Sequence, residues 1–149
     1  MTPENLTHQN PPNFFRAIMV SAAIILLWGI VFITHLWQEG IQGAGVWGYV
    51  SYIALLATII APAAYGWYSR DTTGAIIIGA LPFLLGVGVP GIISSSGQTD
   101  LFSAVAYFLP LSLAGGLEGY FAAKKTPGYL VISLLLAVIW VGIFLSGIH

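Results

Sequence analysis

Apolar residues fill five long stretches of this chain, and short polar segments separate them. The stretches cover residues 14–37, 46–68, 73–93, 101–123 and 128–148. A helix needs about 20 mainly apolar residues to cross the hydrocarbon core of a bilayer, and each stretch is long enough. None alternates polar and apolar residues as a membrane strand does. The pattern therefore predicts an all-α integral membrane protein, a bundle of five transmembrane helices whose backbone groups are satisfied within each helix.

Composition excludes most other classes of protein. Of 149 residues, 58% are hydrophobic and 6% are charged, whereas an ordinary soluble domain carries about 25% charged residues. Four basic residues cannot neutralise a nucleic-acid backbone, so we expect no nucleic-acid partner. Cysteine is absent, which excludes disulfides, thiolate catalysis and cysteine-ligated metals. We expect a multi-pass protein of the cell membrane (plasma or inner membrane), surrounded by membrane lipids.

The few charged residues predict an orientation. With five spans, all the basic residues fall on one side of the membrane: Arg16, Arg70, Lys124 and Lys125. The other side receives Glu39 and Asp100 and no Lys or Arg. Cytoplasmic segments carry the excess of Lys and Arg in membrane proteins. The sequence thus predicts a cytoplasmic N-terminus and a C-terminus outside.

Residues 1–13 are predicted to form a polar cytoplasmic tail, and residues 14–149 a single transmembrane domain. A signal peptide is the alternative for the first stretch, but its apolar run is long and no basic residue precedes Arg16. A re-entrant hairpin is the alternative for the third stretch, which contains Pro82 and Pro90. That hairpin would move Lys124 and Lys125 to the outside, so five full crossings are favoured.

Small residues and prolines distinguish the inner spans. Gly115, Gly119 and Ala123 lie four apart on one face, a spacing that lets helices approach closely in lipid. We therefore expect the second, third and fourth spans at the centre of the bundle or at a subunit interface. Pro82 and Pro110 both fall near mid-membrane, and each frees a backbone carbonyl. Two kinks at similar depth would frame a binding site, or would simply curve the helices.

Glu118 is the one acidic residue inside a predicted span. A charge at the bilayer centre costs about 2.5–3.5 kcal/mol on insertion scales, so such residues are functional candidates. Glu118 precedes Lys124 by six positions, which places it in the inner third of the membrane. One interpretation is a protonatable group in a proton or ion path. The other is an interfacial anchor, a partner of a lysine, or an inter-subunit polar contact.

His35 and Glu39 form a weaker candidate pair at the outer end of the first span. They lie four apart, so they share a face if the helix continues. A histidine and a carboxylate can bind a metal or a quinone headgroup, but two ligands are too few for a closed metal site. We expect no metal, no cofactor and no catalytic residue, and therefore no enzyme.

Three classes of function fit these observations. The favoured one is a non-catalytic subunit of a larger membrane complex, for example a respiratory or other energy-converting assembly, which supplies helix packing and lipid-facing surface. Its small size and short loops motivate this hypothesis, and other membrane subunits would be its partners. The alternative is a small oligomeric transporter or channel that uses the kinked third and fourth spans and Glu118. An enzyme of lipid or quinone chemistry is the third class.

Overall fold

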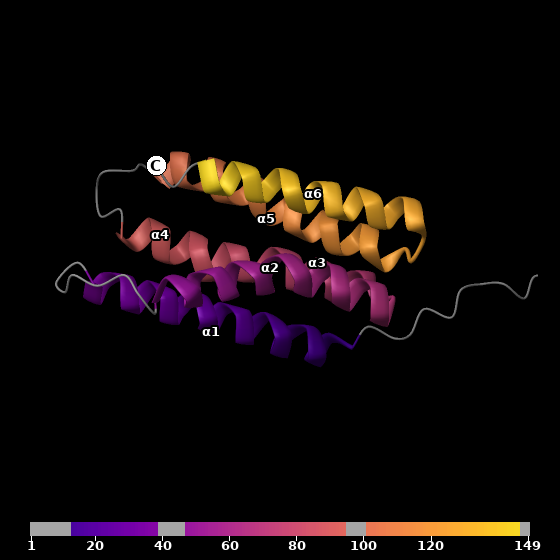
Figure 1. Ribbon diagram of the computed structural model, residues 1–149, viewed down its shortest axis with the longest axis horizontal. Helices are drawn as coiled ribbons and strands as arrows, with labels where there is room; N and C mark the ends of the chain where they lie inside the picture. Colours follow the sequence, from indigo (N-terminus) through magenta and orange to yellow (C-terminus); the bar gives the residue numbers. More distant parts are fainter. Residues whose placement is uncertain (1–12, 39–46, 95–100, 147–149) are drawn as a thin grey trace, which may run out of the picture.

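The computed structural model describes residues 13–38, 47–94 and 101–146, and this part of the chain is helical with no strand. Its elements run side by side as long rods (Figure 1). Three elements, α3, η1 and α4, follow one another without a break and form one rod, named here the third rod. The elements are α1 (Phe14–Gln38), α2 (Trp47–Ser69), α3 (Thr72–Pro82), η1 (Phe83–Gly88), α4 (Val89–Ser94), α5 (Leu101–Ala123) and α6 (Pro127–Ser146).

Four of the rods are long and apolar enough to cross a membrane. The four segments are Phe14–Thr34, Tyr49–Ser69, Thr72–Ile93 and Pro127–Ser146. The helix α5 is as long as α2, with 23 residues each, but it carries Glu118 and is not among the four. Length and composition therefore support a multi-pass membrane protein, as the sequence predicts.

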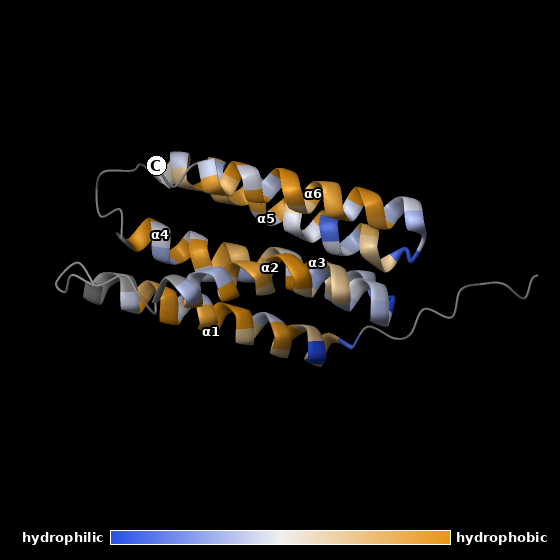
Figure 2. Cartoon of the chain, in the orientation of Figure 1, coloured by the Kyte–Doolittle hydropathy of each residue, from blue (hydrophilic) through white to orange (hydrophobic). Residues whose placement is uncertain are grey.

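Hydrophobic residues predominate along the rods (Figure 2), and many of the large ones are exposed. Leu26 and Ile33 of α1 and Val138 of α6 are 68%, 66% and 71% exposed. Soluble proteins rarely expose apolar side chains over so large a continuous area. These side chains have the chemistry that a lipid environment requires.

The third rod does not turn back on itself, so the re-entrant hairpin is not observed. Its irregularity takes another form, because the helix widens after the buried Pro82 into the π-helical η1. The backbone N–H of Val89 donates to the carbonyl of Leu84, five residues earlier. Ser112 of α5 donates a 2.8 Å hydrogen bond to the carbonyl of Ala80. The same carbonyl also accepts from the backbone N–H of Phe83, so a hydroxyl of α5 adds a second hydrogen bond beside the start of η1.

Close contact between α3 and α5 depends on glycine. A Cβ atom added to Gly79 would overlap the carbonyl oxygen of Gly115, and one added to Gly119 would overlap the carbonyl oxygen of Ala75. From α2, a Cβ added to Gly66 would lie 2.7 Å from the carbonyl oxygen of Gly119. The backbones of α2, α3 and α5 therefore meet at small residues, which is how helices pack closely in lipid.

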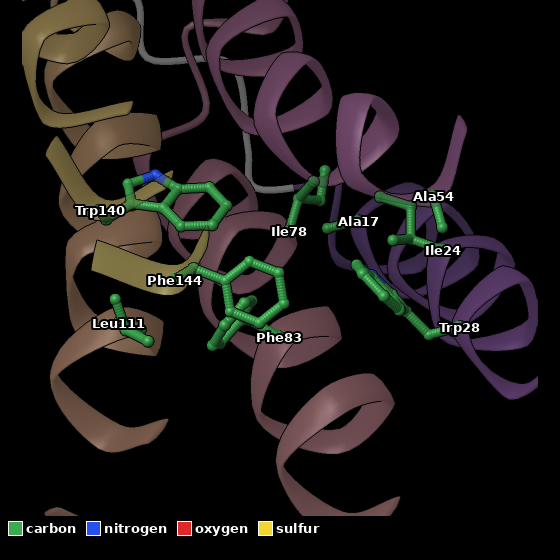
Figure 3. Close-up of a cluster of buried hydrophobic side chains, with 9 residues drawn as sticks. All are labelled: Ala17, Ile24, Trp28, Ala54, Ile78, Phe83, Leu111, Trp140 and Phe144. Carbon is green, nitrogen blue, oxygen red and sulfur yellow. The ribbon is translucent and has the colours of Figure 1, made fainter. Parts of the chain in front are cut away.

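An aromatic cluster fills the space between the third rod, α1 and α6 (Figure 3). The Phe83 ring lies 5.2 Å from the Phe144 ring and 5.5 Å from the Trp140 ring, both edge-on. Trp28 of α1 donates its indole N–H to Thr58 of α2 over 2.9 Å. The cluster thus joins elements from both halves of the chain, with the buried indole N–H of Trp28 satisfied.

Asp71 fixes the junction between α2 and α3. Its Oδ1 accepts from the backbone N–H of Gly74 at 2.9 Å, which caps α3. Its Oδ2 accepts from the Tyr65 hydroxyl at 3.0 Å and from the backbone N–H of Asn13 at 3.2 Å. A single carboxylate therefore connects the start of α1, the end of α2 and the start of α3.

Replacing Asp71 by alanine is expected to destabilise the protein by about 1–2 kcal/mol, because the helix cap is lost. The tyrosine hydroxyl and the Asn13 N–H lose their acceptor as well. Asp71→Asn is the matched control, since its amide oxygen can still accept from Gly74. Unfolding in mixed micelles should rank wild type, Asp71→Asn and Asp71→Ala in that order. Equal stability of wild type and Asp71→Ala would refute this role.

Candidate functional site

Glu118 lies inside the bundle and not at its surface. Its side chain is 1% exposed, although it belongs to the half of α5 that leads to the charged turn. Lys124 does not pair with it, because its ammonium lies 4.5 Å above the ring of Tyr120. The structure thus does not place Glu118 as an exposed interfacial anchor or as a partner of Lys124.

The two oxygens of the Glu118 carboxyl have different surroundings. Oε2 accepts a 2.8 Å hydrogen bond from the indole N–H of Trp140 on α6. Oε1 has no hydrogen-bond partner in the described part of the chain. A buried charge is costly unless it is paired, so the free oxygen marks a position for a proton or a cation. The nearby helix α6 also carries Ser133, whose buried hydroxyl has no partner among the described residues.

A pocket of about 250 Å³ lies beside Glu118, between α2, α5 and α6. Its walls are aliphatic and aromatic, and Glu118 is the charged residue among them. Trp67 and Tyr68 of α2 supply the aromatic part of the wall. Ile60 of α2 and Leu134 of α6 line the pocket and are more than half exposed, so the pocket opens on the outer face of the bundle. The arrangement is an apolar groove with one carboxyl group in its wall.

A second and wider groove, of about 810 Å³, lies between α1 and α2 near the charged end of the bundle. Arg16 is its basic lining residue, beside Phe15 and Met19 of the same helix. Tyr68 lines both grooves. This groove is shallow and exposed, and it contains no buried ionisable group of the kind that Glu118 provides.

The two prolines that the sequence singles out do not line the pocket beside Glu118. Pro82 is buried within the third rod, while Pro110 lies on an exposed part of α5. Neither proline lines either groove, so the structure does not bring the two together around a site. The side chain of His35, although in α1, and all of Glu39 lie outside what the structure describes.

Gly115 and Gly119 flank Glu118 on α5, and they face α3. The carboxyl of Glu118 instead meets α6 through Trp140. One turn of α5 therefore serves two purposes: its glycines permit close packing on one side, and its carboxyl reaches the pocket on the other. The rigid contact on the glycine side holds Glu118 in position.

Trp140 is the site residue that the sequence did not reveal. Tryptophan in membrane helices is enriched at the interfaces, where its N–H meets water. Trp140 instead lies well inside the apolar run of α6, and a buried indole N–H usually finds a partner. That position was the available signal, and the matching acceptor inside a predicted span was Glu118.

Comparison of the chain with protein-family models, with curated proteins and with solved structures finds no match. The function is accordingly argued from the site.

Proposed function

We propose that this protein is a small transporter of the cell membrane, in which Glu118 binds and releases a proton during transport. All five rods cross the bilayer in this proposal, including α5. The helix α5 packs against α2, the third rod and α6, which are all apolar enough to span (Figure 1). A turn of three residues joins it to α6, so the two helices run antiparallel beside each other.

The charges support a cytoplasmic N-terminus and a C-terminus outside. Deep blue, hydrophilic segments gather at one end of the bundle (Figure 2). Arg70 and Lys125 follow the ends of α2 and α5 with φ of 58° and 53°, a conformation that favours glycine. A side chain costs about 1 kcal/mol or more in that conformation. Glycine would be the residue that the backbone conformation favours at both positions. Basic residues stand there instead, which supports a role for their positive charge in the orientation of the helices.

One observation carries the transport proposal: Glu118, whose Oε1 has no hydrogen-bond partner among the described residues, lines an open pocket. Ionisable groups inside the membrane commonly serve proton relays and ion paths, because their insertion is costly. Glu118 lines this pocket, which opens on the outer face of the bundle, while the carboxyl itself stays buried. Exchange of a proton for a solute at one carboxyl is the simplest mechanism that this geometry supports.

Infrared difference spectroscopy tests whether Glu118 takes up a proton within the membrane. The purified protein in lipid nanodiscs is titrated, and the carbonyl band of a protonated carboxylic acid is followed. We expect a band from a buried acid that is present in wild type and missing in Glu118→Gln. Identical titration spectra for the two proteins would contradict the proposal. Circular dichroism at each pH checks in parallel that both proteins keep their helical structure throughout the titration.

A subunit of a larger membrane complex is the second candidate function. Two of the described connections favour it because they are very short. Residues 70–71 join α2 to α3 and residues 124–126 join α5 to α6, and neither connection is long enough to form a site outside the membrane. Solubilisation from the native membrane in mild detergent distinguishes the candidates. Stable association with different membrane proteins would indicate the subunit role. A homo-oligomer free of other proteins would favour the transporter.

A further inference from the structure

The pocket beside Glu118 also indicates which ligand it takes, an inference that rests on the proposed transport function. We propose that the pocket binds a small lipophilic organic cation, a monovalent ammonium ion with one aromatic or branched apolar group. The cation enters from the bilayer between α2 and α6 and pairs with Oε1 of Glu118. Three properties of the pocket support this ligand class: its charge, its size with its walls, and its opening.

The charge of the pocket matches one positive charge. Glu118 supplies one carboxyl, and the Trp140 N–H already occupies Oε2 at 2.8 Å. Oε1 is left without a partner among the described residues, in a side chain that is 1% exposed. Divalent cations such as Ca²⁺ take six to eight oxygen ligands, whereas the rest of this wall is almost entirely apolar. An organic monocation needs one anionic partner and tolerates apolar walls.

The size and the walls fit a compact apolar body. A cavity of about 150 Å³ lined by aliphatic side chains holds benzene, and this pocket has about 250 Å³. That volume suits a ring with a short substituted ammonium group. Trp67 and Tyr68 lie in the wall, and aromatic faces attract organic cations by about 0.5–2 kcal/mol. Ile59 and Leu130 complete the apolar wall.

The opening of the pocket faces the apolar outer surface. Ile60 and Leu134 at this opening are 57% and 54% exposed. The only charged residue that lines the pocket within the described chain is Glu118. A strongly hydrated ion would lose its water along such a path and find almost no polar group to replace it, whereas a lipophilic cation already partitions into the bilayer. The lateral opening therefore favours a ligand that arrives through lipid.

A proton and the cation compete for the same carboxyl. The third rod carries no titratable side chain, and Tyr68 of α2 is the other titratable group that lines the pocket. Tyr129 of α6, Lys124 and Lys125 lie at the α5–α6 turn and do not line it. Cation binding requires the ionised carboxylate, so binding weakens as the pH falls through the titration of Glu118.

The test is direct binding of radiolabelled benzyltrimethylammonium to the protein in nanodiscs. This probe carries a permanent charge, so its own protonation does not change with pH. Neopentylbenzene is the matched neutral compound, with carbon in place of the charged nitrogen. We expect saturable binding that is at least about tenfold weaker in Glu118→Gln, equivalent to about 1.4 kcal/mol. An excess of neopentylbenzene is expected to displace the cation poorly.

Two further variants keep the test informative if Glu118→Gln fails to fold. Glu118→Asp keeps a carboxylate and should keep binding that weakens at low pH. Ala63→Leu fills the pocket, leaves Glu118 in place and should abolish binding. Equal affinity of Glu118→Gln and wild type, or equal affinity for the neutral compound, would overturn the proposal.

The proposed ligand class and the proposed transport function can be refuted independently of each other. If wild type shows Glu118-dependent proton flux but no saturable binding of benzyltrimethylammonium, the ligand class is wrong and the transport function stands. If wild type binds the cation through Glu118 but carries no flux in vesicles, the binding site stands and the transport function is wrong.

Discussion

Glu118→Gln is expected to reduce proton-linked flux across reconstituted vesicles at least about tenfold, to the level of protein-free vesicles. Glutamine has nearly the same shape as glutamate, and its amide oxygen can still accept from the Trp140 N–H. It cannot exchange a proton, so the loss would report the titratable function and not a packing defect. The flux is measured with a pH-sensitive dye trapped in the vesicles, after a potassium gradient with valinomycin imposes a membrane potential.

Glu118→Asp is the control for this experiment. Aspartate keeps the carboxyl group but is shorter, so a reduced yet measurable flux is expected. Folding of each variant is checked by its elution in detergent and its melting temperature. A flux for Glu118→Gln that equals that of wild type would show that Glu118 has no role in proton movement.

Gly79→Ala is expected to destabilise the bundle by about 1–3 kcal/mol, because the added methyl group overpacks a close contact. The new Cβ would overlap the carbonyl oxygen of Gly115, and backbone atoms cannot rotate away. The helices α3 and α5 must then separate, which also displaces Glu118 from the pocket. Unfolding in mixed micelles measures the stability, and cation binding reports the site.

Gly142→Ala on α6 is the matched control, since a Cβ there meets nothing within 4 Å. At such an open helical position alanine is expected to be neutral or to stabilise by about 0.5–1 kcal/mol. The same chemical change should therefore have opposite effects at the two positions. Equal stability of the two variants would contradict the close α3–α5 contact.

The bounds of the helices follow from the sequence, because apolar length decides where a membrane helix begins and ends. At the helix ends that have described residues on both sides, the observed bounds lie within one residue of the prediction: Phe14, Ser69, Thr72, Ala123 and Pro127. The π-helical part of the third rod was not predicted. Pro82 indicates a disturbance of the helix, but proline alone does not specify a π-helix as its form.

The site could be predicted in part. The cost of burying a charge singles out Glu118 from the sequence alone. Its partner Trp140 lies 22 residues away on another helix, and the rotation of α6 about its own axis decides which side chain meets the carboxyl. The pocket likewise depends on how α2 and α6 pack beside α5, which the sequence of each helix alone does not specify. Asp71 is a further example, because its place in a short loop does not reveal that its carboxylate bonds to groups at the ends of three helices.

The central claim is that α5 crosses the membrane and carries Glu118 within it. Because the chain contains no cysteine, single-cysteine variants at the two ends of α5 can be labelled in intact cells with a membrane-impermeant maleimide. We predict labelling of Phe102→Cys from outside, and labelling of Lys124→Cys after permeabilisation alone. Labelling of Lys124→Cys in intact cells, or of neither end from outside before permeabilisation, would contradict the account.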